Sequence, residues 1–227
     1  MKRADDPALV ASQYATEDRL QARRSVYQHV EGPDAREVAF AAIAEGEPRR
    51  VLEVGGGPGE LSARMIEELG TEVVMLDVSE RMVELARAKG VDARVGDVQD
   101  LPFPDDSFDC AVAAWMLYHV PDLDRGLSEL ARVAPRLVAV TNGIDHMREL
   151  KELAGDRAWE PRFRREEAEA ILLRHYSRVE RRDVDGWVTM DAQAARAFIE
   201  SLGDGIRAEV EGPVRARTAP GIFVARR

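Results

Sequence analysis

The chain has 227 residues, with 45% hydrophobic and 33% charged side chains, a composition typical of a soluble globular domain that buries its own core. Its net charge of −10 disfavours nucleic acid as a partner, because an acidic surface repels phosphates. No apolar run reaches the roughly 20 residues that span a bilayer, so we expect no integral membrane segment. The lack of a signal-like start and the single cysteine, Cys110, predict a cytoplasmic protein with no disulfide and no metal centre.

The first two thirds of the chain alternate between helical and strand-like patterns. Residues 8–30 have apolar side chains at helical spacing, and Gly32-Pro33 ends this pattern. Asp34 can cap the helix that follows. The elements expected from there are a helix at 35–45, a strand at 50–54, a helix at 60–69, a strand at 72–76, a helix at 80–89, strands at 93–95 and 108–113, a helix at 123–134 and a strand at 137–141. This alternation predicts an α/β fold with a parallel, doubly wound sheet.

After Asn142 the alternation is lost. The expected elements are helices at 145–154 and 165–175, a strand at 177–190 with a break near Gly186, a helix at 191–202, an irregular stretch at 203–220 and a strand at 222–225. Because no long crossover precedes the last strand, we expect it to run antiparallel, as mixed sheets allow. Trp187 is expected to pack in the core.

A glycine-rich stretch stands out at residues 51–59. The apolar run Val51-Leu52-Glu53-Val54 is followed by Gly55-Gly56-Gly57-Pro58-Gly59, and helical spacing then begins. Glycine accepts positive φ and leaves no side chain between a loop and its ligand. Such a loop at the carboxyl end of the first strand of a parallel sheet predicts a nucleotide-type cofactor site.

Three acidic residues, Glu53, Asp77 and Asp97, lie at the ends of the first three predicted strands. A carboxylate at Asp77 can accept both hydroxyls of an adenosine ribose, but dinucleotide enzymes keep such a residue too. The glycine loop distinguishes a dinucleotide from another adenosine-containing cofactor. A dinucleotide fingerprint has the spacing G-x-G-x-x-G, whereas here Glu60 stands at the helix start. Glu53 and Glu60 oppose a pyrophosphate and suit a ligand with an ammonium or sulfonium charge.

Four stretches together resemble the class I S-adenosylmethionine-dependent methyltransferases, in the branch of ubiquinone/menaquinone-type and other small-molecule enzymes. These stretches are residues 51–59, Leu76-Asp77-Val78-Ser79, residues 96–103 and Ser107-Phe108-Asp109. The resemblance covers about residues 35–142. It implies a Rossmann-like, seven-stranded sheet with an antiparallel last strand. It also implies transfer of a methyl group from S-adenosylmethionine to an oxygen, nitrogen or carbon nucleophile of a small-molecule acceptor.

The resemblance further implies a role for each matched position. The positions are Glu53, Gly55 and Gly57 for the methionyl part and its ammonium, Asp77 for the ribose hydroxyls, Val78, Met82, Asp97 and Val98 for the adenine, Ala114 for the surroundings of the methyl group, and Tyr14 for the cofactor's carboxylate. Asp97 has a second interpretation as a simple loop cap.

His119 follows the fourth strand of the core, at a position where related enzymes often have histidine. It could remove a proton from the acceptor as a catalytic base, position the acceptor, or hydrogen-bond to structure. Trp115, Tyr118, His146 and Trp187 are candidates for the acceptor pocket, with core packing as the favoured interpretation for Trp187. Two alternative functions stay open: a non-catalytic S-adenosylmethionine-binding module and an NAD-dependent oxidoreductase.

We expect a single domain, as a monomer or homodimer. Its predicted parts are a helical lid at 1–34, the cofactor-binding core at 35–142, a helical insertion or lid at 143–176 and closing strands at 177–227.

Overall fold

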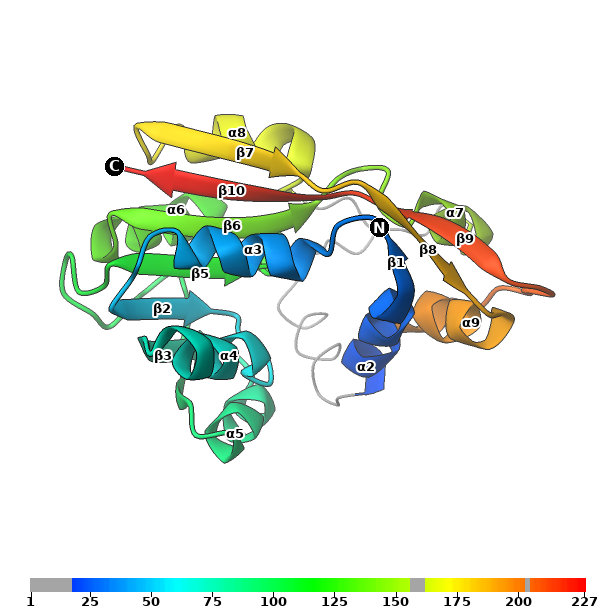
Figure 1. The fold of residues 1–227 in the computed structure, drawn as a ribbon, viewed down its shortest axis with the longest axis horizontal. Helices are drawn as coiled ribbons and strands as arrows, with labels where there is room; N and C mark the ends of the chain where they lie inside the picture. The colour runs from blue at the N-terminus through cyan, green and yellow to red at the C-terminus, as the bar shows by residue number, and fades with distance from the viewer. Residues whose placement is uncertain (1–17, 156–161, 203–204) are drawn as a thin grey trace.

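The centre of the fold is a seven-stranded sheet, seen in a computed structural model that describes residues 18–155, 162–202 and 205–227 (Figure 1). Its strands are β2 (Arg50–Val54), β3 (Glu72–Asp77), β4 (Asp92–Val95), β5 (Cys110–Ala114), β6 (Arg136–Asn142), β7 (Arg178–Asp183) and β10 (Pro220–Arg226). They lie in the order β4-β3-β2-β5-β6-β10-β7. The pairs from β4 to β6 are parallel, and β10 runs antiparallel to both β6 and β7. The predicted mostly parallel sheet with an antiparallel last strand is therefore confirmed.

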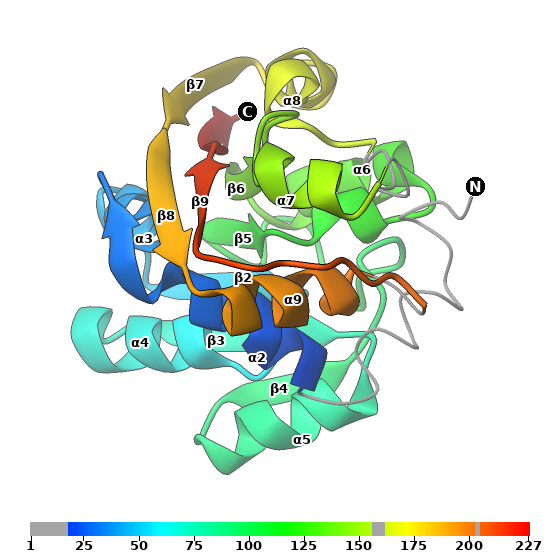
Figure 2. The same ribbon diagram turned by 90° about the vertical axis from the view of Figure 1, so that its right-hand side faces the viewer.

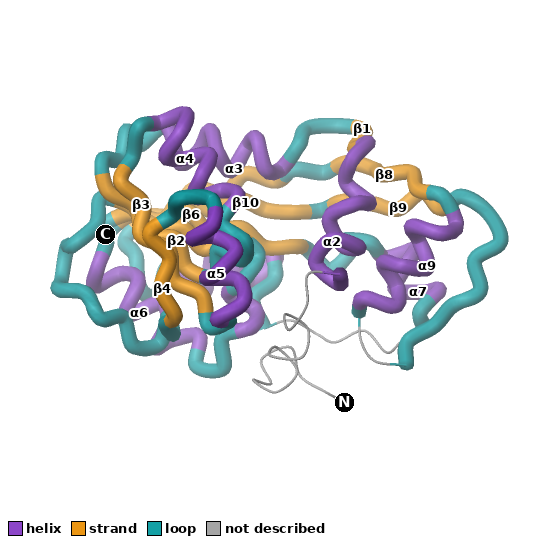
Figure 3. The backbone as a smooth tube through the Cα atoms, turned by 90° about the horizontal axis from the view of Figure 1, so that it is seen from below, coloured by secondary structure: helices purple, strands orange, loops and turns teal. Residues whose placement is uncertain are grey.

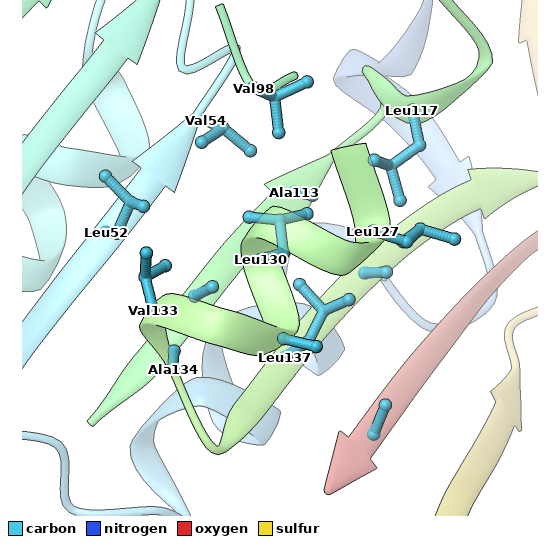
Figure 4. Packing of buried hydrophobic residues seen from close by; sticks show 14 of the residues in the cluster. Leu52, Val54, Val98, Ala113, Leu117, Leu127, Leu130, Val133, Ala134 and Leu137 are labelled. Atoms are coloured by element: carbon cyan, nitrogen blue, oxygen red, sulfur yellow. The ribbon is translucent and has the colours of Figure 1, made fainter. Parts of the chain in front are cut away.

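Helices cover both faces of this sheet. They are α3 (Ala35–Ala44), α4 (Glu60–Leu69), α5 (Glu80–Ala88), α6 (Leu123–Val133) and α8 (Arg165–Leu172). On one face, Ile43 of α3 and Met65 of α4 pack against the central strands. On the other face, Leu127 and Leu130 of α6 pack over Leu137 and its neighbours (Figure 4). A parallel sheet is buried on both sides, which explains why its strands are continuous apolar runs.

Local signals set the ends of the helices in the core. The Asp34 carboxylate accepts the Arg36 backbone N–H at 2.8 Å, and the Ser79 hydroxyl accepts that of Met82 at 3.4 Å. Gly70 ends α4 with a φ of 63°. Asp34 is the capping residue that the sequence analysis predicts, and Ser79 and Gly70 are residue types that favour these caps. The predicted elements between residues 35 and 142 are confirmed with small shifts at their ends, such as the start of β5 at Cys110.

A second, smaller part of the fold lies at one end of the central sheet (Figures 2 and 3). It contains β1 (Val30–Glu31), β8 (Gly186–Met190) and β9 (Val214–Thr218), which form an antiparallel sheet in the order β1-β8-β9. The elements packed with it are α2 (Asp18–Ser25), η1 (Val26–His29), α7 (Arg148–Leu153) and α9 (Ala192–Ser201). Their apolar side chains, such as Val26, Leu150 and Ile199, share one core.

The sequence-based prediction for this second part is wrong in three places. The helix predicted to reach residue 30 gives way to β1 at Val30, and the stretch predicted as irregular contains β9. The strand predicted at 177–190 does break near Gly186, but its two halves belong to different sheets. Trp187 is 37% exposed instead of buried, because it points to the outer side of β8, where the Arg215 guanidinium stacks on its ring at 4.7 Å.

The described ranges contain no helix with the length and apolar character needed to cross a membrane. Within the same ranges, no three His, Cys, Asp or Glu side chains are grouped so that they could hold a metal ion.

Candidate functional site

A cavity of about 840 Å³ lies between the carboxyl ends of the central strands and the second part of the fold. Its volume is in the usual range of small-molecule sites, and the edge where parallel strands end is where such sites form. The structure brings nine of the predicted site residues to its wall: Glu53, Gly55, Gly57, Asp77, Val78, Asp97, Val98, Ala114 and His119. Met82 is buried and is not among the lining residues, and Tyr14 is outside the described residues.

The glycine loop forms part of the wall with bare backbone. Gly55 and Gly57 have φ values of 64° and 57°, in the left-handed region that favours glycine. A Cβ added at Gly55 would lie 2.7 Å from Met116 Cβ, so this position is packed. A Cβ added at Gly57 would meet no atom within 4 Å, and Gly57 lines the cavity. The backbone at Gly57 is therefore open to a ligand.

Asp77 ties this loop to the end of β3. Its two carboxylate oxygens accept the backbone N–H groups of Gly57 and Ser79, each at 2.9 Å. The residue is only 9% exposed, and this burial raises the pKa of its carboxyl group although the two N–H donors oppose the shift. Asp77 therefore has a structural role in the loop as well as a place on the cavity wall.

The other two predicted carboxylates differ in their surroundings. Glu53 is 2% exposed and accepts a short hydrogen bond from the hydroxyl of Ser62 on α4. A buried carboxylate needs such a partner to offset the loss of water. Asp97 accepts the Gln99 backbone N–H at 2.9 Å and its side-chain amide, so it does cap its loop. It also lines the cavity, so the loop cap and a contact to a ligand are compatible.

The end of β5 brings strained backbone to the cavity. Trp115 follows Ala114 and has a φ of 56°, which is rare for a bulky residue. Its backbone N–H donates to Val140 O at 2.9 Å, and its indole N–H donates to Asn142 Oδ1 at 3.0 Å. These bonds hold the two strand ends together. Strain of this kind is concentrated at functional sites.

His119 lies at the end of η2 (Leu117–His119), next to the strained turn. Its ring is packed edge to face on the ring of Tyr118, with 4.5 Å between centroids. Both residues line the cavity, as do Trp115 and His146, so the predicted acceptor-pocket candidates come together. Trp187 does not take part, because it lies on the outer side of β8.

Sequence reasoning missed Tyr27, Asn142 and Lys151, which also line the cavity. Tyr27 Oη and His146 Nε2 are 2.8 Å apart. Tyr27, Asn142 and Lys151 come from η1, β6 and α7, respectively. Only the tertiary fold places such distant segments together, so no local pattern marks them.

Comparison with known proteins identifies relatives of the core of the chain. Residues 52–136 match the family model described as a methyltransferase domain. Over 119 residues, 48% of this chain, the sequence is 39% identical to 2-methyl-6-phytyl-1,4-hydroquinone methyltransferase 2 of Oryza sativa, of which 34% is covered. Over 94 residues, 37% of this chain, it is 38% identical to a ubiquinone/menaquinone biosynthesis C-methyltransferase of Teredinibacter turnerae, of which 38% is covered. The chain thus matches little more than a third of the length of either relative.

A solved structure extends the comparison to the whole chain. Phosphoethanolamine N-methyltransferase 2 of Haemonchus contortus, in complex with phosphomonomethylethanolamine and S-adenosylhomocysteine, superposes with a TM-score of 0.66 and 16% identity. The match covers 100% of this chain and 60% of that one. At this identity the likeness shows the fold alone.

Proposed function

We propose, on the premise that this chain carries a class I S-adenosylmethionine-dependent methyltransferase domain, that it transfers a methyl group from S-adenosylmethionine to an oxygen, nitrogen or carbon nucleophile of a small-molecule acceptor. The observation that carries the proposal is the cavity wall formed by the open backbone at Gly57 and the carboxylates of Asp77 and Glu53. The acidic net charge supports a small acceptor over nucleic acid. We further propose a cytoplasmic monomer or homodimer.

The wall residues fit the parts of this cofactor. Asp77 would accept the ribose hydroxyls with oxygens that already face the loop, and Asp97 would accept from the adenine amino group. Val78, which is 59% exposed, would cover the adenine. Gly55, Gly57 and Glu53 would hold the methionyl part. Val98 would contact the adenine, and Ala114 would lie near the methyl group. Met82, the remaining residue predicted for the adenine, is buried and is not among the lining residues of the cavity.

The chemistry requires alignment more than bond activation by the protein. When bound, S-adenosylmethionine supplies an electrophilic methyl carbon whose leaving group is a neutral thioether. The chain's own task is to hold the acceptor in line with that carbon and to exclude water, which can contribute roughly 7–11 kcal/mol to lowering a barrier. Apolar lining residues such as Leu20, Met147 and Phe198 favour a reaction in which positive charge disappears.

His119→Asn should lower kcat by roughly 10²-fold if the acceptor loses a proton during transfer, the lower end of what acid–base catalysis contributes. His119 is a titratable side chain five residues after the end of β5, and it lines the cavity. Turnover measured against pH should lose its imidazole-dependent limb in this variant, while the Kd for S-adenosylmethionine stays within twofold. An unchanged kcat and pH profile would leave His119 with positioning or structure only.

Calorimetric titration with S-adenosylmethionine, S-adenosylhomocysteine and NAD tests the cofactor. We expect the first two to bind and NAD not to bind. Gly57→Ala should weaken binding by roughly 5- to 150-fold, since overpacking against the bound cofactor costs about 1–3 kcal/mol and each tenfold corresponds to about 1.4 kcal/mol. Gly70→Ala is the matched control, because Gly70 also has positive φ and open space but lies outside the cavity lining.

The outcomes of these titrations separate the alternatives. Binding of NAD in place of S-adenosylmethionine would overturn the proposal in favour of an oxidoreductase. Binding of S-adenosylmethionine without labelled-methyl transfer to any acceptor in a broad panel would favour the non-catalytic module.

A further inference from the structure

Ala219, His146 and Tyr27 form a hydrogen-bonded chain in the second part of the fold, and His146 and Tyr27 line the cavity. The Ala219 backbone N–H donates to His146 Nδ1 at 3.1 Å, so this nitrogen carries no hydrogen. Burial lowers the pKa of His146 to about 3, and the ring is therefore neutral near pH 7. A neutral ring with a bare Nδ1 carries its hydrogen on Nε2.

The tautomer of His146 determines what Tyr27 can do. The Nε2–H group donates to Tyr27 Oη at 2.8 Å, which uses the hydroxyl as an acceptor. The hydrogen of the Tyr27 hydroxyl is then left for another partner, and Tyr27 lines the cavity. Burial raises the pKa of Tyr27, so the hydroxyl keeps its hydrogen. Tyr27 is thus oriented by His146 as a hydrogen-bond donor toward a bound molecule.

Lys151 adds a positive charge to the wall of the same cavity. It lines the cavity one helical turn after Met147, and its charge acts on His146, the partner of Tyr27. Across residues 18–155, 162–202 and 205–227, no hydrogen bond or ion pair of its ammonium is found. Burial lowers the pKa of Lys151 despite the opposing charges of Asp145 and Glu166.

The two nearby carboxylates are held by other groups. Asp145 forms a short ion pair with Arg148 and lies 3.6 Å from a guanidinium nitrogen of Arg217. Glu166 accepts the Ile144 backbone N–H at 3.2 Å and lies 3.8 Å from Arg165. Among the described residues, the Lys151 ammonium is therefore a partly buried charge with no direct contact that offsets its loss of water. A bound anion would supply that contact.

We propose that the methyl acceptor carries an oxyanion, a carboxylate or a phosphate, that is bound by the Lys151 ammonium and the Tyr27 hydroxyl. This inference rests on the proposed function, since it names the class of acceptor for the same cavity. The carboxylates of Glu53 and Asp77 lie beside the glycine loop, where the cationic donor would bind, whereas Lys151 lines the cavity from α7 in the second part of the fold. The nucleophile of the acceptor would then face the region of Ala114 and His119.

The test compares binding of acids with binding of their neutral counterparts. The full chain, saturated with S-adenosylhomocysteine, is mixed with small hydroxy acids, with their methyl esters, and with phosphate monoesters, and the thermal midpoint is recorded. We expect acids to raise the midpoint and the esters to have little effect. The carboxylate and phosphate arms show which oxyanion the site prefers.

Variants then assign the effect to residues. Lys151→Met should weaken acid binding by at least about tenfold, because truncating one partner of a buried charge pair is costly, and Lys151→Arg should restore part of it. Tyr27→Phe should weaken acid binding several-fold. Arg94→Met is the control, since it removes the same charge from an exposed pair with Asp92 and should change nothing.

Methyl transfer provides the kinetic readout. With labelled S-adenosylmethionine and an acid that binds, Lys151→Met should raise KM by a larger factor than it lowers kcat. Calorimetry should give the same Kd for S-adenosylmethionine in wild type, Lys151→Met and Tyr27→Phe. Equal binding of acids and esters, no stabilisation by any acid, or acid binding that survives Lys151→Met would each overturn the inference. Cofactor binding in the same samples would leave the proposed function standing.

Discussion

Asp77→Ala should weaken binding of S-adenosylmethionine by at least about a hundredfold. Two ribose hydroxyls donating to a carboxylate contribute about 1.5–3 kcal/mol each, and about 1.4 kcal/mol corresponds to a factor of ten in Kd. Alanine also removes the acceptor for the backbone N–H groups of Gly57 and Ser79, so the glycine loop loses its anchor to β3. Calorimetric titration gives the Kd, and circular dichroism checks that the chain is folded.

Two further variants make this result interpretable. Asp92→Ala removes an exposed carboxylate that pairs with Arg94, and it should leave the Kd unchanged. Asp77→Asn keeps one oxygen acceptor and should fall between wild type and alanine. A Kd for Asp77→Ala within threefold of wild type would show that the ribose does not bind there.

The raised pKa of Asp77 also predicts how binding depends on pH. Burial disfavours the charged carboxylate in the free protein, whereas the ribose hydroxyls favour it by donating to it. Binding therefore lowers the pKa and releases a proton at acidic pH. Affinity should rise with pH until the free protein's Asp77 is ionised, and Asp77→Asn should lose this dependence.

Gly59→Ala should be the most destabilising of the loop substitutions. Gly59 has a φ of 75°, and an added Cβ would lie 2.6 Å from Ala86 Cβ and 3.0 Å from Ala86 Cα. Left-handed backbone costs a non-glycine residue roughly 1–2 kcal/mol, and overpacking adds about 1–3 kcal/mol. At roughly 2–4 °C per kcal/mol for a chain of this size, we expect Tm to fall by about 5–20 °C.

Gly90→Ala separates the two contributions to that loss. Gly90 has a φ of 83°, but a Cβ there would meet no atom within 4 Å. It should therefore show only the backbone cost, with a Tm loss of a few degrees by the same scaling. Equal Tm values for the two variants would mean that α4 and α5 do not approach as closely as the structure has them.

The core of the fold could be predicted because its signals are local. The strand at 50–54 and the helix at 60–69 have the predicted bounds, since an apolar run, a glycine cluster and the αL glycine at Gly70 define them without reference to the rest of the chain. The resemblance to class I methyltransferases rests on the same region and is confirmed by the matched domain at 52–136.

The second part could not be predicted in this way, because its contacts join distant segments. Val30 pairs with Val188 and Met190 with Val214, so neither edge of β8 is set by a neighbouring turn. One signal was present: Val214–Thr218 alternates between apolar or small residues and arginine, which is a strand pattern. The same alternation along β8 would have placed Trp187 on the outer side.

The site divides in the same manner. Glu53, Asp77 and Asp97 were found because strands of a parallel sheet end at one edge. Tyr27 and Lys151 were missed because they come from η1 and α7, which only the tertiary fold brings to the wall of one cavity. Met82 is buried and is not among the lining residues, and its place three residues after the cap Ser79 gives no information on which side of α5 faces the wall.

The two ends of the cavity are built from different kinds of chain segment. The glycine-loop end is encoded by one continuous run, from Glu53 to His119, whereas the opposite end is collected from η1, α7 and the segment before β10. Mutations that change the acceptor specificity of such an enzyme can therefore accumulate in the separate segments, while the run from Glu53 to His119 stays unchanged. A library diversified at Tyr27 and Lys151 would explore new acceptors with the donor affinity held constant.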